Sequence, residues 1–307
     1  MLFLEEKDLD RGFMKDLLVS IIVPTYNQTD NLKRAVISLI SQTYQNIEII
    51  VIDDNSDVNI KSQNLKYFND LNNDKIIYLQ NEKNMGSTAS RNKGIFKSRG
   101  DYITFLDDDD EYLSNKIETQ LNEMIKHNAD FSATNVKLYN ENGKITDVRN
   151  RNYLYFDLNE SLLVKHLKYH ITSTNTLMFK KNFLISIGGF DEENLGDEFY
   201  LMAKAFQKSN NFIHVNSCDV KAYVHSTTGL SSAENKIKGE KKLFDYKMSF
   251  NQILSNKDIR YIKMRYYAVF AFAYKKSKKY FKCLFYAIKS FFVAPVSFLT
   301  LFNSKGK

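Results

Sequence analysis

The stretch VSIIVPTYNQTDNLKRAVISLISQTYQNIEIIVIDDNS, residues 19–56, decides the fold class. Apolar runs at 18–24 and 47–53 have the pattern of strands that are buried on both faces. Between them, residues 29–42 carry apolar side chains at helical spacing. Two buried strands joined by a helix through short links predict a parallel sheet with right-handed crossovers.

The same alternation continues beyond this stretch. Apolar runs at 75–80 and 101–106 predict two further strands, and residues 87–98, between Gly86 and Gly100, predict a helix. The fold class is therefore α/β, with a mostly parallel sheet flanked by helices. Farther along we expect a helix at 114–128, a hairpin around Glu141-Asn142-Gly143, a strand at 173–181 and a helix within 188–209.

Polar clusters follow three of the predicted strands. In sheets of this kind, ligands bind just beyond the carboxyl ends of the strands, so we expect one site where the clusters meet. The clusters are Thr25-Tyr26-Asn27, Asp53-Asp54-Asn55-Ser56 and Asp107-Asp108-Asp109-Asp110.

Four adjacent aspartates at 107–110 pose an electrostatic problem, because packed carboxylates repel one another unless a cation or water lies among them. If the preceding strand continues, Asp107 and Asp109 project to one side, and Asp108 and Asp110 to the other. Such oxygen ligands are typical of a magnesium or manganese site that also binds a substrate diphosphate. A solvated acidic turn is the other interpretation that these residues allow.

Composition and charge narrow the class of protein. A chain of 307 residues with 43% hydrophobic residues can bury a proper core, and the distant Cys218 and Cys283 suit a reducing compartment. No signal peptide is expected at the N-terminus, where a short apolar start precedes mixed charges. Residues 241–307 contain 15 Lys and Arg but only two acidic residues. The rest of the chain contains 28 Lys and Arg and 34 acidic residues, so the positive charge is concentrated in the C-terminal segment.

This basic C-terminal segment is also rich in tyrosine and phenylalanine. Its charge-free runs fall short of the roughly 20 residues that span a bilayer. We therefore expect helices of residues 241–307 to lie on an anionic membrane surface, with helices packed on the main domain as the alternative. Stacking of single-stranded nucleic acid on the aromatic side chains is a third interpretation, which we do not favour.

Residues 19–56, quoted above, and NMGSTASRNKGIFKSRGDYITFLDDDD at 84–110 closely resemble the bacterial family 2 glycosyltransferases of the GT-A fold. The resemblance implies an inverting enzyme that uses a nucleotide sugar together with Mn²⁺ or Mg²⁺. It covers about residues 18–232. The implied domains are an N-terminal extension at 1–17, a GT-A type domain at 18–235 and a basic helical tail at 236–307.

The resemblance assigns donor-binding roles to the first clusters and to the predicted helix at 87–98. Pro24, Thr25 and Tyr26 would form the wall for the uracil and the ribose. Asp54 would accept the uracil N–H, and Arg91 would lie near the nucleotide or its diphosphate.

The aspartate run matches the Asp-x-Asp motif of the family. Asp107 or Asp108 would meet the ribose, and Asp109 would bind the metal that bridges the diphosphate. Asp110 matches the extra acid that commonly ends the motif. His225, in a segment similar to the late part of the family domain, is the candidate for a further metal ligand.

An inverting transfer needs a general base that deprotonates the acceptor hydroxyl. The family usually places this base in an acidic pair that opens a helix after GGFDE, and here the pair is Asp197-Glu198, in reversed order. We favour Asp197, which directly follows Gly196, with Glu198 as the alternative. Both could instead be first-turn acids that interact with the helix dipole. Candidates for lining the acceptor site are Thr172, Ser173 and Thr174.

Together these features predict transfer of a hexose or N-acetylhexosamine from a UDP-sugar to a growing bacterial surface glycan. Whether this glycan is a capsule, a teichoic acid or a lipooligosaccharide stays open, as does whether the acceptor is lipid-linked. We expect a cytoplasmic enzyme, peripheral on the inner face of the membrane, with no nucleic acid partner; homo-oligomer formation stays open.

Two other functions compete with that of a glycosyltransferase. A nucleotidyltransferase is expected to have a glycine-rich, basic phosphate loop after the first strand, and VPTYNQTDN at 23–31 has neither glycine nor lysine. The other is a non-catalytic nucleotide-binding or membrane-binding module, and the intact Asp107, Asp109 and Asp197 argue against it.

Overall fold

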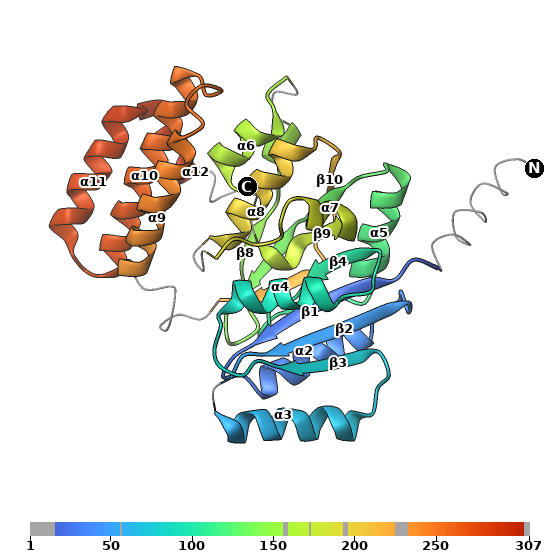
Figure 1. Ribbon diagram of the computed structural model, residues 1–307. Helices are drawn as coiled ribbons and strands as arrows, with labels where there is room; N and C mark the ends of the chain where they lie inside the picture. Colours follow the sequence, from blue (N-terminus) through green and yellow to red (C-terminus); the bar gives the residue numbers. More distant parts are fainter. Residues whose placement is uncertain are drawn as a thin grey trace, which may run out of the picture. The chain divides into compact units, whose positions relative to one another are not determined.

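The computed structural model describes residues 16–55, 57–155, 159–171, 173–192, 196–224 and 233–303 (Figure 1). These residues group into two compact units. The sheet unit takes in the described residues up to 155 and from 171 to 224, and the helical unit takes in residues 159–170 and 233–303.

The sheet unit alternates strands and helices along the chain. Its strands are β1 (Val19–Thr25), β2 (Ile47–Asp53), β3 (Ile76–Gln80), β4 (Tyr102–Phe105), β5 (Glu111–Tyr112), β6 (Phe131–Thr134), β7 (Val136–Tyr139), β8 (Ile145–Arg149), β9 (Leu177–Lys180), β10 (Phe212–Val215) and β11 (Val220–Tyr223). Its helices are α2 (Asp30–Ile40), α3 (Val58–Leu71), α4 (Ser87–Lys97), α5 (Lys116–Lys126), α7 (Lys181–Ser186) and α8 (Asp197–Lys208), with the short 3-10 helices η1 (Asn152–Tyr155) and η2 (Thr174–Thr176).

A seven-stranded sheet forms the core, in the order β10-β6-β9-β4-β1-β2-β3. Only β9 runs antiparallel to its neighbours among these described strands. Val19, Ile21 and Val23 of β1 pack in one cluster with α2, whereas Ile22, on the other face, meets Gly94 of α4. Helices therefore cover both faces, and the predicted α/β fold with its mostly parallel sheet is confirmed.

The central strands separate at the carboxyl end of β1. Strand β1 pairs with β4 as far as Ile22 and Phe105, but with β2 as far as Thr25 and Asp53. Pro24 thus has no β4 residue opposite it, which suits a residue that cannot donate to a strand ladder. This is the edge at which α/β sheets bind ligands.

A second, four-stranded sheet has the order β5-β11-β7-β8. Strands β7 and β8 pair antiparallel, which confirms the hairpin predicted around Glu141-Asn142-Gly143. Strand β5 lies directly after the aspartate run, so this sheet continues from the same edge.

Three expectations about the elements need correction. No helix was expected over α3, which has a largely polar sequence and buries only Asn64 and Phe68. The helix expected at 87–98 ends at Lys97, and Gly100 has another role: a Cβ there would lie 2.7 Å from the Ser20 amide nitrogen. The strand expected at 173–181 begins with η2 and is extended only over β9.

The helical unit consists of α6 (Leu162–Tyr169), α9 (Ala233–Met248), α10 (Asn256–Lys276), α11 (Tyr280–Val293) and α12 (Pro295–Asn303). Lys168 Nζ joins α6 to α10 through an ion pair of 2.9 Å with Asp258. The predicted boundary at 235 therefore differs from this division, because residues 159–170 group with the later helices. In the described part of the chain, no helix is long and apolar enough to cross a membrane.

Candidate functional site

Arg91 of α4 is at the centre of the candidate site. Its Nη1 donates to Asp197 Oδ2 at 2.5 Å, and its Nη2 donates to Asp107 Oδ1 at 2.6 Å. The Arg91 and Asp197 side chains are 7% and 9% exposed, so this ion pair is buried. One guanidinium therefore joins the start of α8 to the aspartate run after β4, and three of the predicted site residues are brought together.

The loop before α4 determines where this helix starts. Asp54, at the end of β2, accepts hydrogen bonds from the backbone N–H groups of Met85 and Gly86 and from the Asn81 side chain, each at 2.8 Å. Gly86 is the N-cap and has a φ of 87°, a value that favours glycine. Asp54 is buried and holds this loop. Its predicted contact with uracil, which would use remaining lone pairs of the carboxylate, stays a prediction.

The aspartate run is a turn and not an extension of β4. The Asp110 N–H donates to the Asp107 carbonyl oxygen at 3.1 Å, so the side-chain alternation expected of a strand was wrong. Asp108 instead accepts a hydrogen bond from the Tyr26 N–H at 3.1 Å. Asp110 accepts the Tyr223 N–H at 2.8 Å and a hydrogen bond from the Asn175 side chain. The turn therefore directs the carboxylates of Asp107, Asp108 and Asp110 to different partners.

Negative charge is in excess within this turn. Burial raises the pKa of Asp108 to about 7, and the charges of Asp109 and Asp107 add to the shift. Burial and the same two neighbours raise the pKa of Asp110 well above its usual range. A divalent cation with a preference for oxygen ligands fits such a donor set, because it would offset this repulsion.

The predicted metal ligands are only partly covered by the structure. Asp109 lies in the turn, while His225 lies outside the described residues. In the ranges that the structure describes, no three His, Cys, Asp or Glu side chains are grouped so that they could hold a metal. Of the two proposed metal ligands, Asp109 is therefore the one that lies within the described residues.

The acidic pair at the start of α8 has two distinct environments. Gly196 precedes the helix with a φ of 73°, and Asp197 Oδ1 accepts the Glu198 N–H at 2.9 Å. Burial, the hydrogen bond with Asp197 and the charge of that residue together raise the pKa of Glu198 to about 8, and burial is the largest of these causes. At neutral pH, Glu198 is therefore protonated while Asp197 faces the positive charge of Arg91.

The other predicted donor and acceptor residues lie near the same edge. Pro24 and Thr25 are buried at the end of β1, and the side chain of Tyr26 is exposed just beyond them. Ser173 and Thr174 open η2, directly before Asn175, which contacts the aspartate turn. Thr172 is outside the described residues.

Three residues that support the turn were not predicted from the sequence: Arg34, Asn175 and Tyr223. Arg34 Nη2 donates to the Asp109 carbonyl oxygen at 2.6 Å, and its guanidinium carbon lies 4.3 Å from the centre of the Tyr223 ring. Arg34 sits on the amphipathic helix α2, where a surface arginine is ordinary, so its sequence context contains no signal of this contact.

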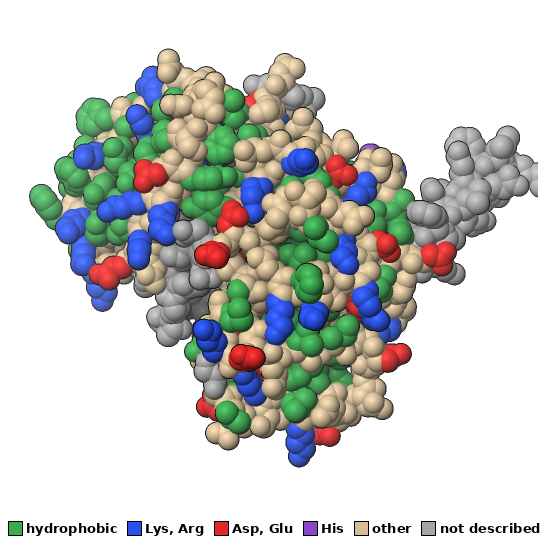
Figure 2. Space-filling view, in the orientation of Figure 1, with side chains coloured by type: hydrophobic (Ala, Val, Ile, Leu, Met, Phe, Trp, Pro, Cys, Tyr) green, Lys and Arg blue, Asp and Glu red, His purple; other side chains and the backbone are tan. Residues whose placement is uncertain are grey.

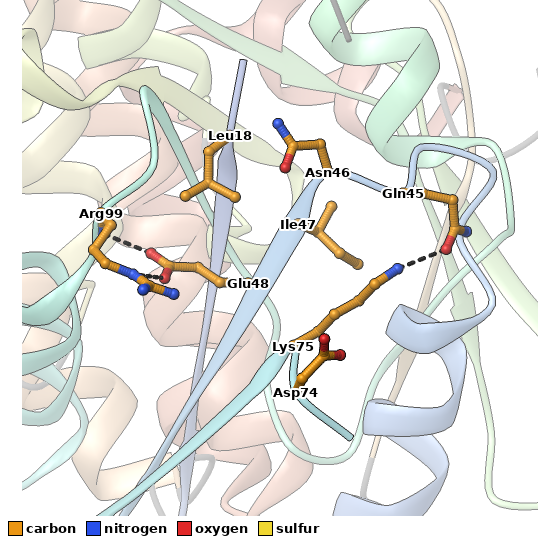
Figure 3. A pocket seen from close by; sticks show the side chains of 8 residues that line it. All are labelled: Leu18, Gln45, Asn46, Ile47, Glu48, Asp74, Lys75 and Arg99. Atoms are coloured by element: carbon orange, nitrogen blue, oxygen red, sulfur yellow. Dashed lines mark hydrogen bonds and ion pairs between the residues drawn. The ribbon is translucent and has the colours of Figure 1, made fainter. Parts of the chain in front are cut away.

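A cavity of about 410 Å³ lies elsewhere, at the amino ends of the strands (Figure 3). Leu18 precedes β1, Ile47 begins β2, and Lys75 precedes β3. In Figure 3, Arg99 points to Glu48 and Lys75 points to Gln45, and these residues belong to the end of the sheet opposite the aspartate turn. The cavity is therefore separate from the candidate site.

Comparisons with known proteins agree with the fold and with the resemblance to family 2 glycosyltransferases. Residues 20–184 match the model of the family described as Glycosyl transferase family 2. Over 129 residues the chain is 36% identical to the UDP-Glc:alpha-D-GlcNAc-diphosphoundecaprenol beta-1,3-glucosyltransferase WfgD of Escherichia coli, a match that covers 42% of this chain and 49% of that protein. The GalNAc(5)-diNAcBac-PP-undecaprenol beta-1,3-glucosyltransferase of Campylobacter jejuni is 28% identical over 295 residues, 93% of each chain.

The chain spans less than half of the length of the first curated relatives, with 19% for an uncharacterized glycosyltransferase of Rickettsia bellii and 49% for WfgD. Among solved structures, S. aureus TarS 1-349 in complex with UDP-GlcNAc is similar, with a TM-score of 0.59 and 16% identity. That match covers 90% of this chain and 91% of the TarS chain. At this identity the likeness shows the fold alone.

Proposed function

Since this chain belongs to glycosyl transferase family 2, we propose that it is an inverting, metal-dependent transferase of a hexose or N-acetylhexosamine. Its donor is a UDP-sugar, and its acceptor is a hydroxyl group of a growing bacterial surface glycan. The observation that carries the proposal is the contact of Arg91 with both Asp107 and Asp197. This contact unites the proposed diphosphate end of the donor site with the proposed general base.

In the proposed reaction, Asp197 accepts the proton of the acceptor hydroxyl, whose oxygen then forms a bond to the anomeric carbon. The bond from this carbon to the diphosphate oxygen breaks, and its electron pair leaves with UDP. Asp197 suits this role because its carboxylate contacts Arg91 directly, whereas the pKa of Glu198 is raised to about 8, chiefly by burial. Arg91 also restrains Asp197. Its guanidinium contacts Asp197 and Asp107 at the same time, and this limits how far either carboxylate can move.

The aspartate turn would bind the donor. Bound Mn²⁺ or Mg²⁺ would supply Lewis acid stabilisation of the leaving diphosphate, with Asp109 as its proposed ligand and His225 as a second candidate. Asp107 contacts Arg91, Asp108 contacts the Tyr26 N–H, and one of these two carboxylates is proposed to meet the ribose. The exposed ring of Tyr26 provides a surface for the uracil.

The acceptor is proposed to be lipid-linked and the enzyme to act peripherally at the inner face of the cell membrane. The support for this comes from the two curated relatives whose names specify acceptors on diphosphoundecaprenol or PP-undecaprenol. The excess of basic residues in 241–307 is consistent with this location.

Donor turnover tests the proposal directly. UDP release would be measured with UDP-Glc, UDP-Gal, UDP-GlcNAc and UDP-GalNAc, each with Mn²⁺, with Mg²⁺ and with a chelator. We expect one or two of these donors to be turned over in a metal-stimulated reaction. An absence of turnover with all four donors, with either metal, would overturn the proposed UDP-sugar donor.

A further inference from the structure

Helix α11 turns its apolar side outward. Its inward side consists largely of small or polar residues, and Ser290 is fully buried with its Oγ donating to the Met264 carbonyl oxygen of α10 at 2.7 Å. The outward side is apolar. Its exposed large side chains are Tyr280, Phe281, Leu284, Phe285, Ile288, Phe291 and Phe292, and α12 adds Val296 and Leu299.

The spacing of these residues makes them one continuous surface, which we call the α11 face. Phe281, Phe285, Ile288 and Phe292 follow one another at intervals of three or four residues, and Leu284 lies three residues after Phe281 and four before Ile288, so all five line one side of the helix. Phe281 is 87% exposed. Packing of α11 on α10 leaves these rings in solvent, and a contiguous exposed apolar surface of this kind marks an interaction site.

The charges around the α11 face favour one kind of partner. Lys282 and Lys289 lie along its flank, and Lys289 Nζ is 4.5 Å from the centre of the Phe285 ring. Further lysines occupy the turn between α10 and α11, and no acidic residue follows Asp258 in the sequence. Figure 2 shows hydrophobic side chains interspersed with lysine and arginine over the C-terminal helices. A protein partner would need acidic residues of its own opposite these lysines. The headgroups of an anionic bilayer supply the negative charge for all of them.

We propose that the α11 face inserts into the interface of an anionic bilayer, with its aromatic and aliphatic side chains among the acyl chains and its lysines at the headgroups. The inference rests on the proposed peripheral location at the membrane, which it deepens by identifying the surface that makes contact. It replaces the broad expectation for residues 241–307, because α10 uses much of its apolar surface inside the helical unit: Ile262, Met264 and Phe270 are buried.

Vesicle binding by the full chain tests this inference. Sedimentation would be compared for vesicles of phosphatidylcholine alone and vesicles that also contain phosphatidylglycerol, at low and high salt. We expect strong binding only to the anionic vesicles, weakened by salt. A variant with Phe281→Ser, Phe285→Ser and Phe292→Ser should bind at least about tenfold more weakly, since it loses the inserting side chains. The variant Lys282→Gln with Lys289→Gln should lose much of the preference for anionic vesicles.

The control is Phe96→Ser, which removes a ring that is 81% exposed on α4 of the sheet unit. Its vesicle binding should equal that of the unchanged chain, and circular dichroism should show that all variants are folded. The inference would be overturned if the triple serine variant bound anionic vesicles as strongly as the unchanged chain does. It would also be overturned if the unchanged chain did not bind vesicles and dimerised through these rings. Donor turnover without vesicles should be the same in the triple variant, so a failure of membrane binding is distinguishable from a failure of the proposed transferase activity.

Discussion

Arg91 and Asp197, 106 residues apart in the sequence, form a buried ion pair with 2.5 Å between Nη1 and Oδ2. The same guanidinium holds Asp107 through its other terminal nitrogen. Breaking such a contact leaves a charge in a poorly solvated place, which costs about 3–5 kcal/mol for a buried pair. The geometry therefore couples the stability of the site to its proposed chemistry.

Replacement of Arg91 by lysine should separate charge from geometry. Lysine keeps the positive charge but cannot contact Asp107 and Asp197 with a planar fork. We expect the catalytic efficiency kcat/KM of Arg91→Lys to fall about 100-fold, because misplaced catalytic groups cost about that much. Steady-state kinetics would check this. Arg99→Lys is the matched control: its side chain is 70% exposed beside Glu48, and its activity should not change. Full activity in Arg91→Lys would contradict the role of the fork.

The two acids at the start of α8 should respond differently to neutralisation. Asp197→Asn should lower kcat by about 10²–10⁴, the usual contribution of a general base, while UDP binding is retained. Glu198→Gln should keep most activity because Glu198 is already protonated at neutral pH. Asp191→Asn, an acid paired with Lys204 at 2.6 Å in the sheet unit, serves as the control and should be fully active. The reverse pattern, with transfer lost only in Glu198→Gln, would assign the base to Glu198.

Glu198 should also make the stability of the protein depend on pH. Its pKa is 4.5 when unfolded and is raised to about 8 in the fold, so the folded state binds this proton more tightly. The resulting stabilisation is complete below the unfolded pKa and is lost as the pH rises through about 8. Thermal unfolding from about pH 6 to about pH 9 should show Tm falling more steeply in the unchanged chain than in Glu198→Gln. Parallel Tm curves would contradict the raised pKa.

Asp109 should be required for the effect of the metal on the donor. We expect Asp109→Ala to abolish the increase in UDP-sugar affinity that Mn²⁺ produces, because the proposed ligand is removed. Calorimetric titration with and without Mn²⁺ would measure this. Asp30→Ala removes a carboxylate that is 94% exposed on α2 and should leave the metal effect intact. An undiminished metal effect in Asp109→Ala would place the cation on other ligands.

The parallel strands were predictable because their signal is local. Strand β2 has the bounds read from its apolar run, and β1 differs from its predicted range by one residue at each end. The family was predictable for the same reason, since its motifs occupy short ordered segments. In contrast, α3 has a polar sequence with little periodicity, and β10 and β11 are short strands whose pairing partners are far away in the chain.

The candidate site was predictable in its residues but not in its contacts. Strand ends that carry polar clusters were expected to meet, and the order of β4, β1 and β2 in the sheet brings them together. Nothing in the residues themselves indicated that Asp54 would be buried as the anchor of the loop before α4, or that Arg34 would brace the aspartate turn. Such contacts depend on side-chain directions that only packing determines.

The sequence by itself determined the α/β class, the family and the edge of the sheet at which the proposed chemistry lies, because hydrophobic periodicity and compact motifs are properties of neighbouring residues. The tertiary structure alone decided that one arginine joins Asp107 to Asp197 and that the aromatic side of α11 faces solvent. Both depend on long-range packing, in which residues far apart in the chain compete for the same buried space.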